Sequence, residues 1–297
     1  MVPMRGLSLK RVSLVAVALS LAACAAPSGP LVPRKETVYG VTASNKLVSF
    51  VAGQPSAMTA TKPLTGLAAN ERLVGIDFRV ARGTLFGLGS TGQLYTIDTK
   101  TGEATKVGAA ATPSVLTGTN FGVDFNPTVD RIRVVSDAGL NMRMHPDTGA
   151  VVDSNADTPG VQLDGTPAFA EGDANFGKTP KLVAAGYTYN KKNEKLTTNY
   201  AIDAATGSLV TQGSREDAMP VVSPNTGRLF TVGRLDVGTF VDASFDITDR
   251  DNTALLSINT SGARDSVLYL VELATGRTYR IGAIGAGEPL VGMAIEP

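Results

Sequence analysis

The sequence contains an internal repeat, and a repeat constrains the fold more than any single motif does. Residues 75–102 align without a gap on residues 122–149, and six of the 28 aligned positions are identical. A second ungapped match places residues 94–108 on residues 268–282, and residues 200–207 repeat the same turn more loosely. Such a chain is expected to fold as a series of similar units that pack against their neighbours.

Each unit contains short segments rich in Val, Ile, Leu, Phe, Tyr and Thr, separated by turns that contain glycine, which indicates strands. We predict four strands in one unit, at residues 73–78, 84–89, 93–98 and 103–107. Four strands in a repeat of about 40–50 residues are the signature of a β-propeller blade. The sequence therefore predicts an all-β protein that forms a single β-propeller.

The number of blades follows from the number of inner strands. Residues 181–235 are long enough for an additional unit, so six blades are the alternative to five. Residues 290–295 (LVGMAI) resemble residues 73–78 (LVGIDF), whereas residues 38–65 offer three strands without an inner one. We expect the C-terminal strand to complete the N-terminal blade, which removes two exposed sheet edges. Five four-stranded blades then have inner strands near Leu73, Phe121, Phe169 to Ala174, Ala243 to Ile247 and Leu290.

Residues 1–23 predict an export signal. Three basic residues precede an apolar stretch at residues 12–22, which is too short to span a bilayer as a helix. The stretch ends in Leu21-Ala22-Ala23-Cys24, which resembles a bacterial lipobox, where the cysteine is lipidated and becomes the first residue. A plain secretory signal is the alternative, and it leaves the only cysteine of the chain unexplained.

The chain that remains after cleavage is expected to be attached to a membrane through the lipid on Cys24. Residues 24–37 are rich in Pro, Gly and Ser and predict a tether, and residues 38–297 form the propeller domain. We expect an extracytoplasmic location, at the outer membrane or cell surface if the source has an outer membrane. Ala25 follows the cysteine, instead of the Asp that commonly retains lipoproteins on the inner membrane.

Composition excludes several classes of function. One Cys, one His and no Trp cannot supply a Cys/His zinc cluster or a disulfide framework. Removal of residues 1–23 removes three basic residues and no acidic one, which leaves a net charge of −3 and argues against a nucleic-acid partner. The chain has no nucleophile elbow, phosphate-binding loop or dinucleotide fingerprint.

Several longer strings resemble one bacterial family. They are GIDF at residues 75–78, GVDFNPTVDRIRVVSD at 122–137, EGDANFGKTPKLVAAGYTYN at 171–190, and the ATGR and IGAIG segments near the C-terminus. These strings are similar to the family called domain of unknown function 4394, over most of residues 38–297. The resemblance implies a secreted or surface-attached protein of propeller type and implies no established activity.

Four aspartates recur at positions that we assign to inner strands: Asp77, Asp124, Asp173 and Asp246. One interpretation is a ring of carboxylates that holds a hard cation such as Ca²⁺ in the axial channel. The other is that each carboxylate accepts hydrogen bonds from the backbone of the neighbouring blade. The second interpretation needs no ligand.

The third unit departs from the repeat. Arg131, Arg133, Arg143 and His145 stand where the preceding unit has Thr84, Phe86, Thr96 and Asp98. Because side chains alternate along a strand, these residues and Asn141 can share one face and bind an anionic group such as a carboxylate, sulfate or phosphate. The alternative is a solvated face on which Asp130 and Asp137 neutralise the arginines. His145 is then a surface residue.

The segment that follows carries a weaker signal. Asp153, Asn155, Asp157 and Asp164 have the spacing of a calcium loop, but Thr158 replaces the turn glycine and an Asp replaces the final Glu. A plain polar loop explains the same residues.

Taken together, these observations predict a lipid-anchored propeller that binds or scaffolds an envelope component, such as a protein or a glycan, and that is not an enzyme. The alternative is a hydrolase or lyase of carbohydrates or lactones that uses axial carboxylates, with or without calcium. Paired carboxylates favour binding, whereas a solvent-filled carboxylate pocket favours catalysis.

Overall fold

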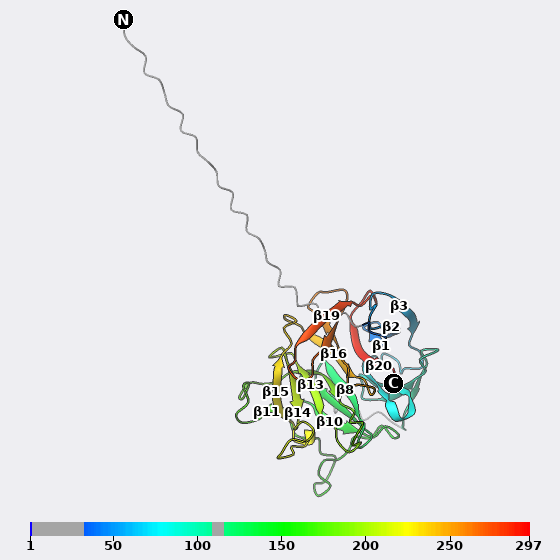
Figure 1. Cartoon of the computed structure of the whole chain (residues 1–297). Coiled ribbons are helices and arrows are strands. Elements are labelled where there is room, and N and C mark those ends of the chain that lie inside the picture. Colours follow the sequence, from blue (N-terminus) through cyan, green and yellow to red (C-terminus); the bar gives the residue numbers. More distant parts are fainter. Residues whose placement is uncertain (2–32, 109–115) are drawn as a thin grey trace.

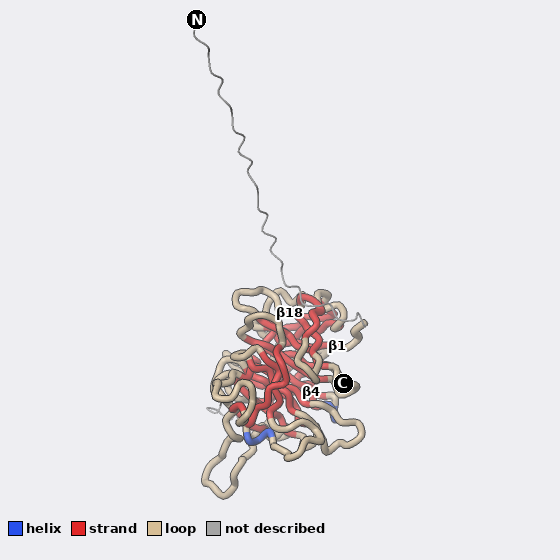
Figure 2. Tube along the Cα trace, turned by 60° about the vertical axis from the view of Figure 1, so that its left-hand side comes forward, coloured by secondary structure: helices blue, strands red, loops and turns tan. Residues whose placement is uncertain are grey.

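Five small sheets surround one axis in the computed structural model, which describes Met1 and residues 33–108 and 116–297 (Figures 1 and 2). Neighbouring strands within the sheets are antiparallel, except for one short parallel pair at the edge of one sheet. The protein is a five-bladed β-propeller, which confirms the predicted fold class and excludes the six-bladed alternative. Within the described ranges, no helix is long and apolar enough to cross a bilayer.

Blades 1 and 2 are four-stranded. Blade 1 has the order β20 (Leu290–Ile295), β1 (Thr37–Thr42), β2 (Lys46–Val51) and β3 (Met58–Pro63). Blade 2 has the order β4 (Leu73–Arg79), β5 (Thr84–Gly89), β6 (Leu94–Ile97) and β7 (Ala104–Lys106), with a single 3₁₀ turn, η1 (Val80–Arg82), after β4. The four strands of blade 2 agree with the predicted unit.

The other three blades differ in size. Blade 3 has three strands, β8 (Phe121–Asn126), β9 (Arg131–Ser136) and β10 (Asn141–Met144). Blade 4 has five, in the order β12 (Leu182–Tyr187), β13 (Asn199–Asp203), β14 (Ser208–Gln212), β15 (Arg228–Arg234) and β11 (Ala168–Phe169), with η2 (Pro224–Thr226) before β15. Blade 5 has four, β16 (Asp242–Ile247), β17 (Ala254–Asn259), β18 (Val267–Val271) and β19 (Thr278–Ala283). The prediction of four strands in every blade is therefore wrong for blades 3 and 4.

The C-terminal strand closes the ring. β20 pairs antiparallel with β1, with Val38 opposite Ile295 and Gly40 opposite Met293. Figure 1 shows β20, at the red end of the colour series, beside the blue strands of blade 1. The predicted closure is confirmed.

The predicted inner strand of blade 4 is wrong. Phe169 lies in β11, which pairs in parallel with β15 at the outer edge of the blade. The inner strand is β12, which contacts β8 on one side and β16 on the other. The sequence Gly172-Asp173 resembles the inner-strand motif, but it belongs to a turn after β11.

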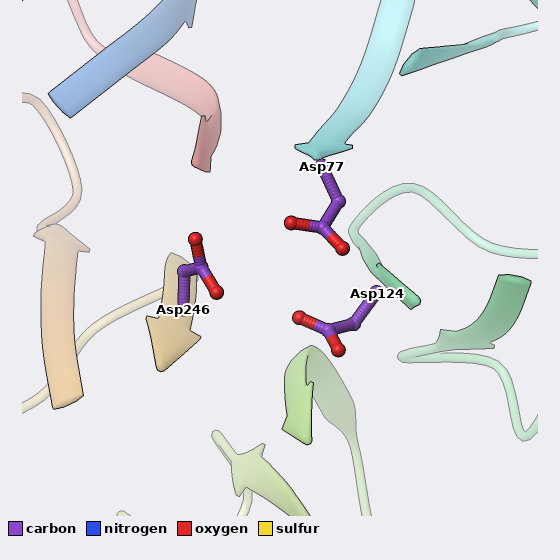
Figure 3. Close-up of side chains that lie close together, drawn as sticks. All are labelled: Asp77, Asp124 and Asp246. Atoms are coloured by element: carbon purple, nitrogen blue, oxygen red, sulfur yellow. The ribbon is translucent and has the colours of Figure 1, made fainter. Parts of the chain in front are cut away.

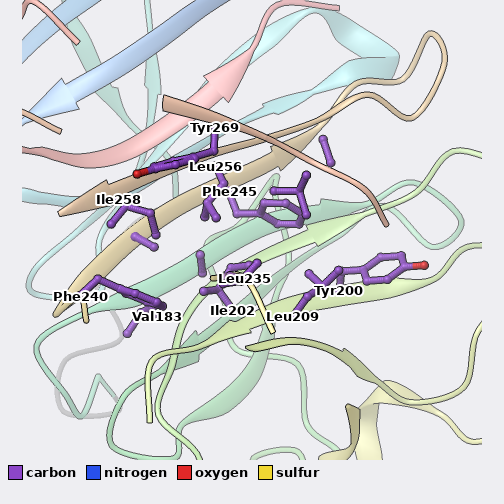
Figure 4. Close-up of a cluster of buried hydrophobic side chains, with 14 of the residues drawn as sticks. Val183, Tyr200, Ile202, Leu209, Leu235, Phe240, Phe245, Leu256, Ile258 and Tyr269 are labelled. Atoms are coloured by element: carbon purple, nitrogen blue, oxygen red, sulfur yellow. The ribbon is translucent and has the colours of Figure 1, made fainter. Parts of the chain in front are cut away.

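The hydrophobic core is divided into five clusters, and each lies between two neighbouring blades. The cluster between blades 4 and 5, for example, packs Ile202 and Leu209 against Phe245 and Leu256 (Figure 4). Burial of apolar surface contributes about 25 cal/mol per Å², so these contacts hold the blades together side by side.

Small residues let the inner strands approach at the axis. Gly75, Gly122, Ala184, Ser244 and Gly292 line a narrow axial gap of about 10 Å³, one from each blade. A Cβ atom on Gly122 would lie 2.6 Å from the backbone carbon of Ala184, which is closer than real Cβ contacts. The inner strands are therefore in close contact around the axis at these five residues. The next residue on the same face of each strand, two positions further along, lies just beyond this contact.

Candidate functional site: the axial carboxylates and the pocket beside them

Three aspartates meet on the axis. Asp77 of β4, Asp124 of β8 and Asp246 of β16 each follow one of the small axial residues by two positions, so they lie on the same strand face. One carboxylate oxygen from each lies within 4.8 Å of the others. Figure 3 shows the three carboxylates pointing toward a common space. The structure therefore brings together three of the four recurring aspartates.

Each of these carboxylates binds the backbone of the next blade. Asp77 accepts a hydrogen bond from the Phe125 N–H at 2.7 Å, and Asp124 accepts one from the Tyr187 N–H at 3.0 Å. Asp246 accepts one from the Ile295 N–H at 2.6 Å. The carboxylates therefore tie neighbouring blades together, as the second interpretation predicted.

The other two blades lack the aspartate. Gly186 and Ala294 directly precede Tyr187 and Ile295, as Asp124 precedes Phe125, and so occupy the same position in blades 4 and 1. By the pattern of the other blades, a carboxylate at position 186 would accept the N–H of Ile247 in blade 5. Gly186 has no carboxylate, and Asp246 accepts this N–H with its second oxygen, at 2.6 Å.

Burial alters the acidity of these groups. Asp77, Asp124 and Asp246 are 4%, 3% and 6% exposed. Burial and the neighbouring carboxylates raise the pKa of Asp77 and of Asp124 well above the usual value. Burial also raises the pKa of Asp246 to about 7. Three carboxylates this close cannot all ionise without a compensating positive charge, so bound protons or a cation must balance them.

The ring has the donor chemistry of a hard-cation site. Carboxylate oxygens are the ligands that Ca²⁺ prefers, and it takes six to eight of them. Asp77, Asp124 and Asp246 are the described residues that could hold such an ion, and other ligands would have to complete the shell. The ring also fits shared protons, which need no further ligands.

Asp173 does not join the ring, so its predicted place is wrong. It lies in the turn after β11, where its carboxylate accepts the Thr231 N–H at 2.6 Å and the Thr231 hydroxyl at 2.7 Å. These hydrogen bonds and that of Asn175 lower its pKa, against the opposing effect of burial. Asp173 therefore stays ionised and anchors the turn to β15.

A pocket of about 570 Å³ opens at the axial mouth, where the inner strands end. We call it the axial-mouth pocket. Its walls come from blades 2, 3, 4 and 5, and its polar and charged lining residues are Arg79, Arg82, Asn126, Asp130, Tyr189, Asn190, Lys191, Glu194 and Asp249. Its size is that of a pocket for a small molecule.

Tyr189 is held firmly in this pocket. The Asn252 side chain accepts the Tyr189 N–H at 2.7 Å and donates to the Tyr189 carbonyl at 3.1 Å. Burial, followed by the charges of the three ring aspartates and Asp249, raises the pKa of the Tyr189 hydroxyl. The backbone of Tyr189 is therefore fixed where the residue lines the pocket.

The arginine face is occupied from within the protein. Arg133 is 1% exposed, and it donates to Asp164 at 2.5 Å, to Asn225 at 2.6 Å and to Asn141 at 2.8 Å. Arg143 donates twice to Asp164, at 2.8 Å each. Alternation correctly places Arg133, Asn141 and Arg143 on one face, and the anion that they meet is the carboxylate of Asp164.

The alternative interpretation, in which Asp130 and Asp137 neutralise these arginines, is wrong about the partners. Asp130 pairs with Arg79 instead, and Asp137 accepts hydrogen bonds from Thr119. Asp164 lies at the end of the segment with calcium-loop spacing, where its bonds to Arg133 and Arg143 serve the fold.

Arg131 and His145 lie apart from this network. Arg131 donates to the backbone carbonyl of Asp130 at 2.8 Å, and the His145 ring accepts the Asp147 N–H at 3.2 Å. Cys24 and the signal segment lie outside the described residues.

Sequence reasoning missed the axial-mouth pocket. Arg79 follows the recurring Asp77 by two residues, and this spacing could have indicated the axial-mouth pocket. Tyr189 and Asn190 lie in residues 171–190, one of the segments that resemble the family, but they do not depart from a repeat. Nothing in the sequence therefore marks them as pocket residues.

Comparison with solved structures finds distant likenesses. A Bacteroides thetaiotaomicron VPI-5482 protein of unknown function matches 86% of this chain and 60% of its own, at 14% identity and a TM-score of 0.43. Hydrazine synthase of Kuenenia stuttgartiensis matches 74% of this chain and 51% of its own, at 11% identity and a TM-score of 0.37. This chain thus spans about half to three fifths of the length of both proteins.

A third likeness is to a Bacteroides uniformis ATCC 8492 protein provisionally named a 6-phosphogluconolactonase. The match covers 86% of this chain and 84% of the Bacteroides uniformis chain, at 13% identity and a TM-score of 0.39. Likenesses this distant say nothing about activity. A comparison with curated proteins finds no match.

The family model is more informative. The model described as a domain of unknown function, DUF4394, matches residues 46–294. The match runs from β2 of the first blade to the strand that closes the ring. Because it covers most of the chain, the protein belongs to the DUF4394 family.

Proposed function

We propose that this protein is a lipid-anchored, extracytoplasmic binding module of the cell envelope, and that its ligand binds in the axial-mouth pocket. The observation that carries this proposal is the pocket itself, with walls from four blades and a mixture of charged, amide, aromatic and apolar side chains. A rigid scaffold with a small-molecule-sized pocket suits binding.

The state of the carboxylates supports binding over catalysis. Asp77, Asp124 and Asp246 are buried, and each gives an oxygen to a backbone N–H of the next blade. A general acid or nucleophile must reach a substrate atom at hydrogen-bond distance. The alternative, a hydrolase or lyase of carbohydrates or lactones, draws its support from the convergence of the same three groups.

The binding site is tested by filling it. Ala81 lines the pocket and is exposed, so Ala81→Trp should occupy part of the space and leave the fold intact. Ala205→Trp is the matched control, since exposed Ala205 lies in the turn beside the start of β12, at the other face of the propeller. Wild type and both variants are titrated with soluble peptidoglycan and polysaccharide fragments by calorimetry.

We expect fragments that bind wild type to bind Ala81→Trp at least about tenfold more weakly and Ala205→Trp equally well. Equal binding to all three proteins would reject the pocket. Incubation of each fragment with wild type, followed by mass spectrometry, separates the alternative, because product formation would identify an enzyme.

The anchor is tested by Cys24→Ala. This variant should move from the membrane fraction to the soluble fraction with an unchanged melting temperature, because stable anchoring requires the acyl chains. Retention of the variant in the membrane fraction would contradict lipid anchoring.

A further inference from the structure

The charges of the residues that line the axial-mouth pocket nearly cancel. The Arg79 guanidinium is neutralised within the protein, because it pairs with Asp130 and, at 2.6 Å, with Asp147. Arg82 and Lys191 are opposed in the lining by Glu194 and Asp249. The net charge of the lining therefore does not select the sign of a ligand's charge.

Tyr189 and Asp249 differ from the other lining residues. Asp249 is a carboxylate whose side chain is only 19% exposed, and Tyr189 lines the same pocket. Arg79 does not offset Asp249, because it is already paired with Asp130 and Asp147. The field of a carboxylate is stronger in the low-dielectric wall of a pocket than in open water. A positive charge beside Asp249 is therefore favoured.

Asp249 offers an incompletely satisfied carboxylate. Its Oδ1 atom is buried and accepts no hydrogen bond from the described residues. Its Oδ2 atom lies 3.8 Å from Nζ of Lys191, whose side chain is 62% exposed. An ion pair this long and this exposed is weak, so a ligand cation can replace the lysine.

Tyr189 offers a second contact for a cation. The aromatic face attracts an ammonium group, and attraction is strongest where water is excluded. The clamp from Asn252 fixes the backbone that carries the ring, so little order has to be gained on binding. The apolar wall of Val80, Pro127 and Leu196 can accept a short methylene chain.

We propose that the axial-mouth pocket is selective for organic cations, and that it takes a ligand with a primary ammonium group seated between Tyr189 and Asp249. This inference rests on the proposed function and adds the chemical class of the ligand. The methylene part of the ligand lies along the apolar wall, and its ammonium group displaces Lys191 from Asp249.

The experiment uses three small probes of equal length and different charge. They are 1,4-diaminobutane, 1,4-butanediol and succinate, which are respectively dicationic, neutral and dianionic at pH 7. Calorimetric titration of the full domain with each probe isolates the effect of charge. We expect diaminobutane to bind and the other two to give no measurable heat of binding.

Three variants locate the site. Asp249→Asn removes the charge but keeps the shape, and should weaken diaminobutane binding by about tenfold or more. Lys191→Gln removes the competing cation and should tighten binding by about threefold, the worth of an exposed ion pair. Asp236→Asn is the matched control, because Asp236 is 81% exposed in its side chain and lies outside the pocket. It should leave the affinity unchanged.

Opposite effects in Asp249→Asn and Lys191→Gln would support the inference, and a folding defect cannot produce the gain in Lys191→Gln. Binding of succinate or butanediol that Ala81→Trp abolishes would overturn the cation class and leave the pocket as a binding site. Diaminobutane binding that neither variant alters would overturn the location. Calcium chloride that binds alone and abolishes the diaminobutane response would assign the charge selectivity to the aspartate ring instead.

Discussion

Arg133 is a charged side chain that is buried at a strand position where the preceding unit has Phe86. Burial of a guanidinium is unfavourable unless its donors are satisfied and its charge is paired. Asp164, Asn141, Asn225 and the Tyr187 hydroxyl together provide those partners. The break in the repeat is therefore explained by a network that joins blade 3 to blade 4 and to the turn before β15.

Part of this network could be predicted from the sequence. Alternation along β9 and β10 places Arg133 and Arg143 on one face, because side chains on a strand repeat every two residues. Asp164 could not be assigned to them, since it stands in a loop without periodicity. Loops have no repeat that fixes where a side chain points.

Asp164→Asn should strongly destabilise the protein, because it leaves Arg133 buried without a counter-charge. The expected loss in the free energy of unfolding is about 3–5 kcal/mol, as for other broken buried pairs. Chemical denaturation measures it, with Asp157→Asn as the control in the same loop, where the aspartate is exposed. A loss below 1 kcal/mol would show that the pair does not stabilise the fold.

The inner strands show what sequence patterns can and cannot identify. β4, β8, β16 and β20 carry related motifs, so their places could be predicted. β12 has Gly186 where three of the others have the aspartate, and its motif is lost. The nearby Gly172-Asp173 imitates the motif, although this aspartate only anchors a turn. A repeat therefore fails as a guide where one copy has lost the residue that defines it.

Deletion of residues 290–297 should destabilise the whole domain. It removes β20, which pairs with β1, and it exposes the cluster that contains Leu290, Met293 and Ile295. It also removes the N–H group that Asp246 binds. Circular dichroism melts of the truncated and full domains should differ by many degrees or show loss of cooperativity. Coincident melts would contradict closure by this strand.

At the scale of the whole molecule, buried carboxylates make the stability of the fold depend on pH. Asp246 and, at the other end of β16, Asp242 each have a pKa of about 7, raised chiefly by burial from 3.8. Such a group binds its proton more tightly in the folded state than in the unfolded state. Its contribution to stability is complete below about pH 4 and is lost as the pH rises through 7.

The free energy of unfolding of wild type should therefore fall by about 1–3 kcal/mol between pH 5 and pH 8. Asp246→Asn should show a smaller fall, because its amide does not titrate. Asp173→Asn is the control, because the pKa of Asp173 is lowered and its effect appears only in acid. Stability that rises from pH 5 to pH 8 in wild type would contradict protonation of the ring.

Closure of the ring also has a consequence in time. β1 stands near the beginning of the chain, and its partner β20 leaves the ribosome only after every other strand of the propeller. Until then, blade 1 has an unpaired inner edge, and the Asp246 carboxylate lacks the Ile295 N–H that donates a hydrogen bond to it. A growing chain thus cannot complete its fold step by step, and the ring stays open until synthesis has reached the last strand.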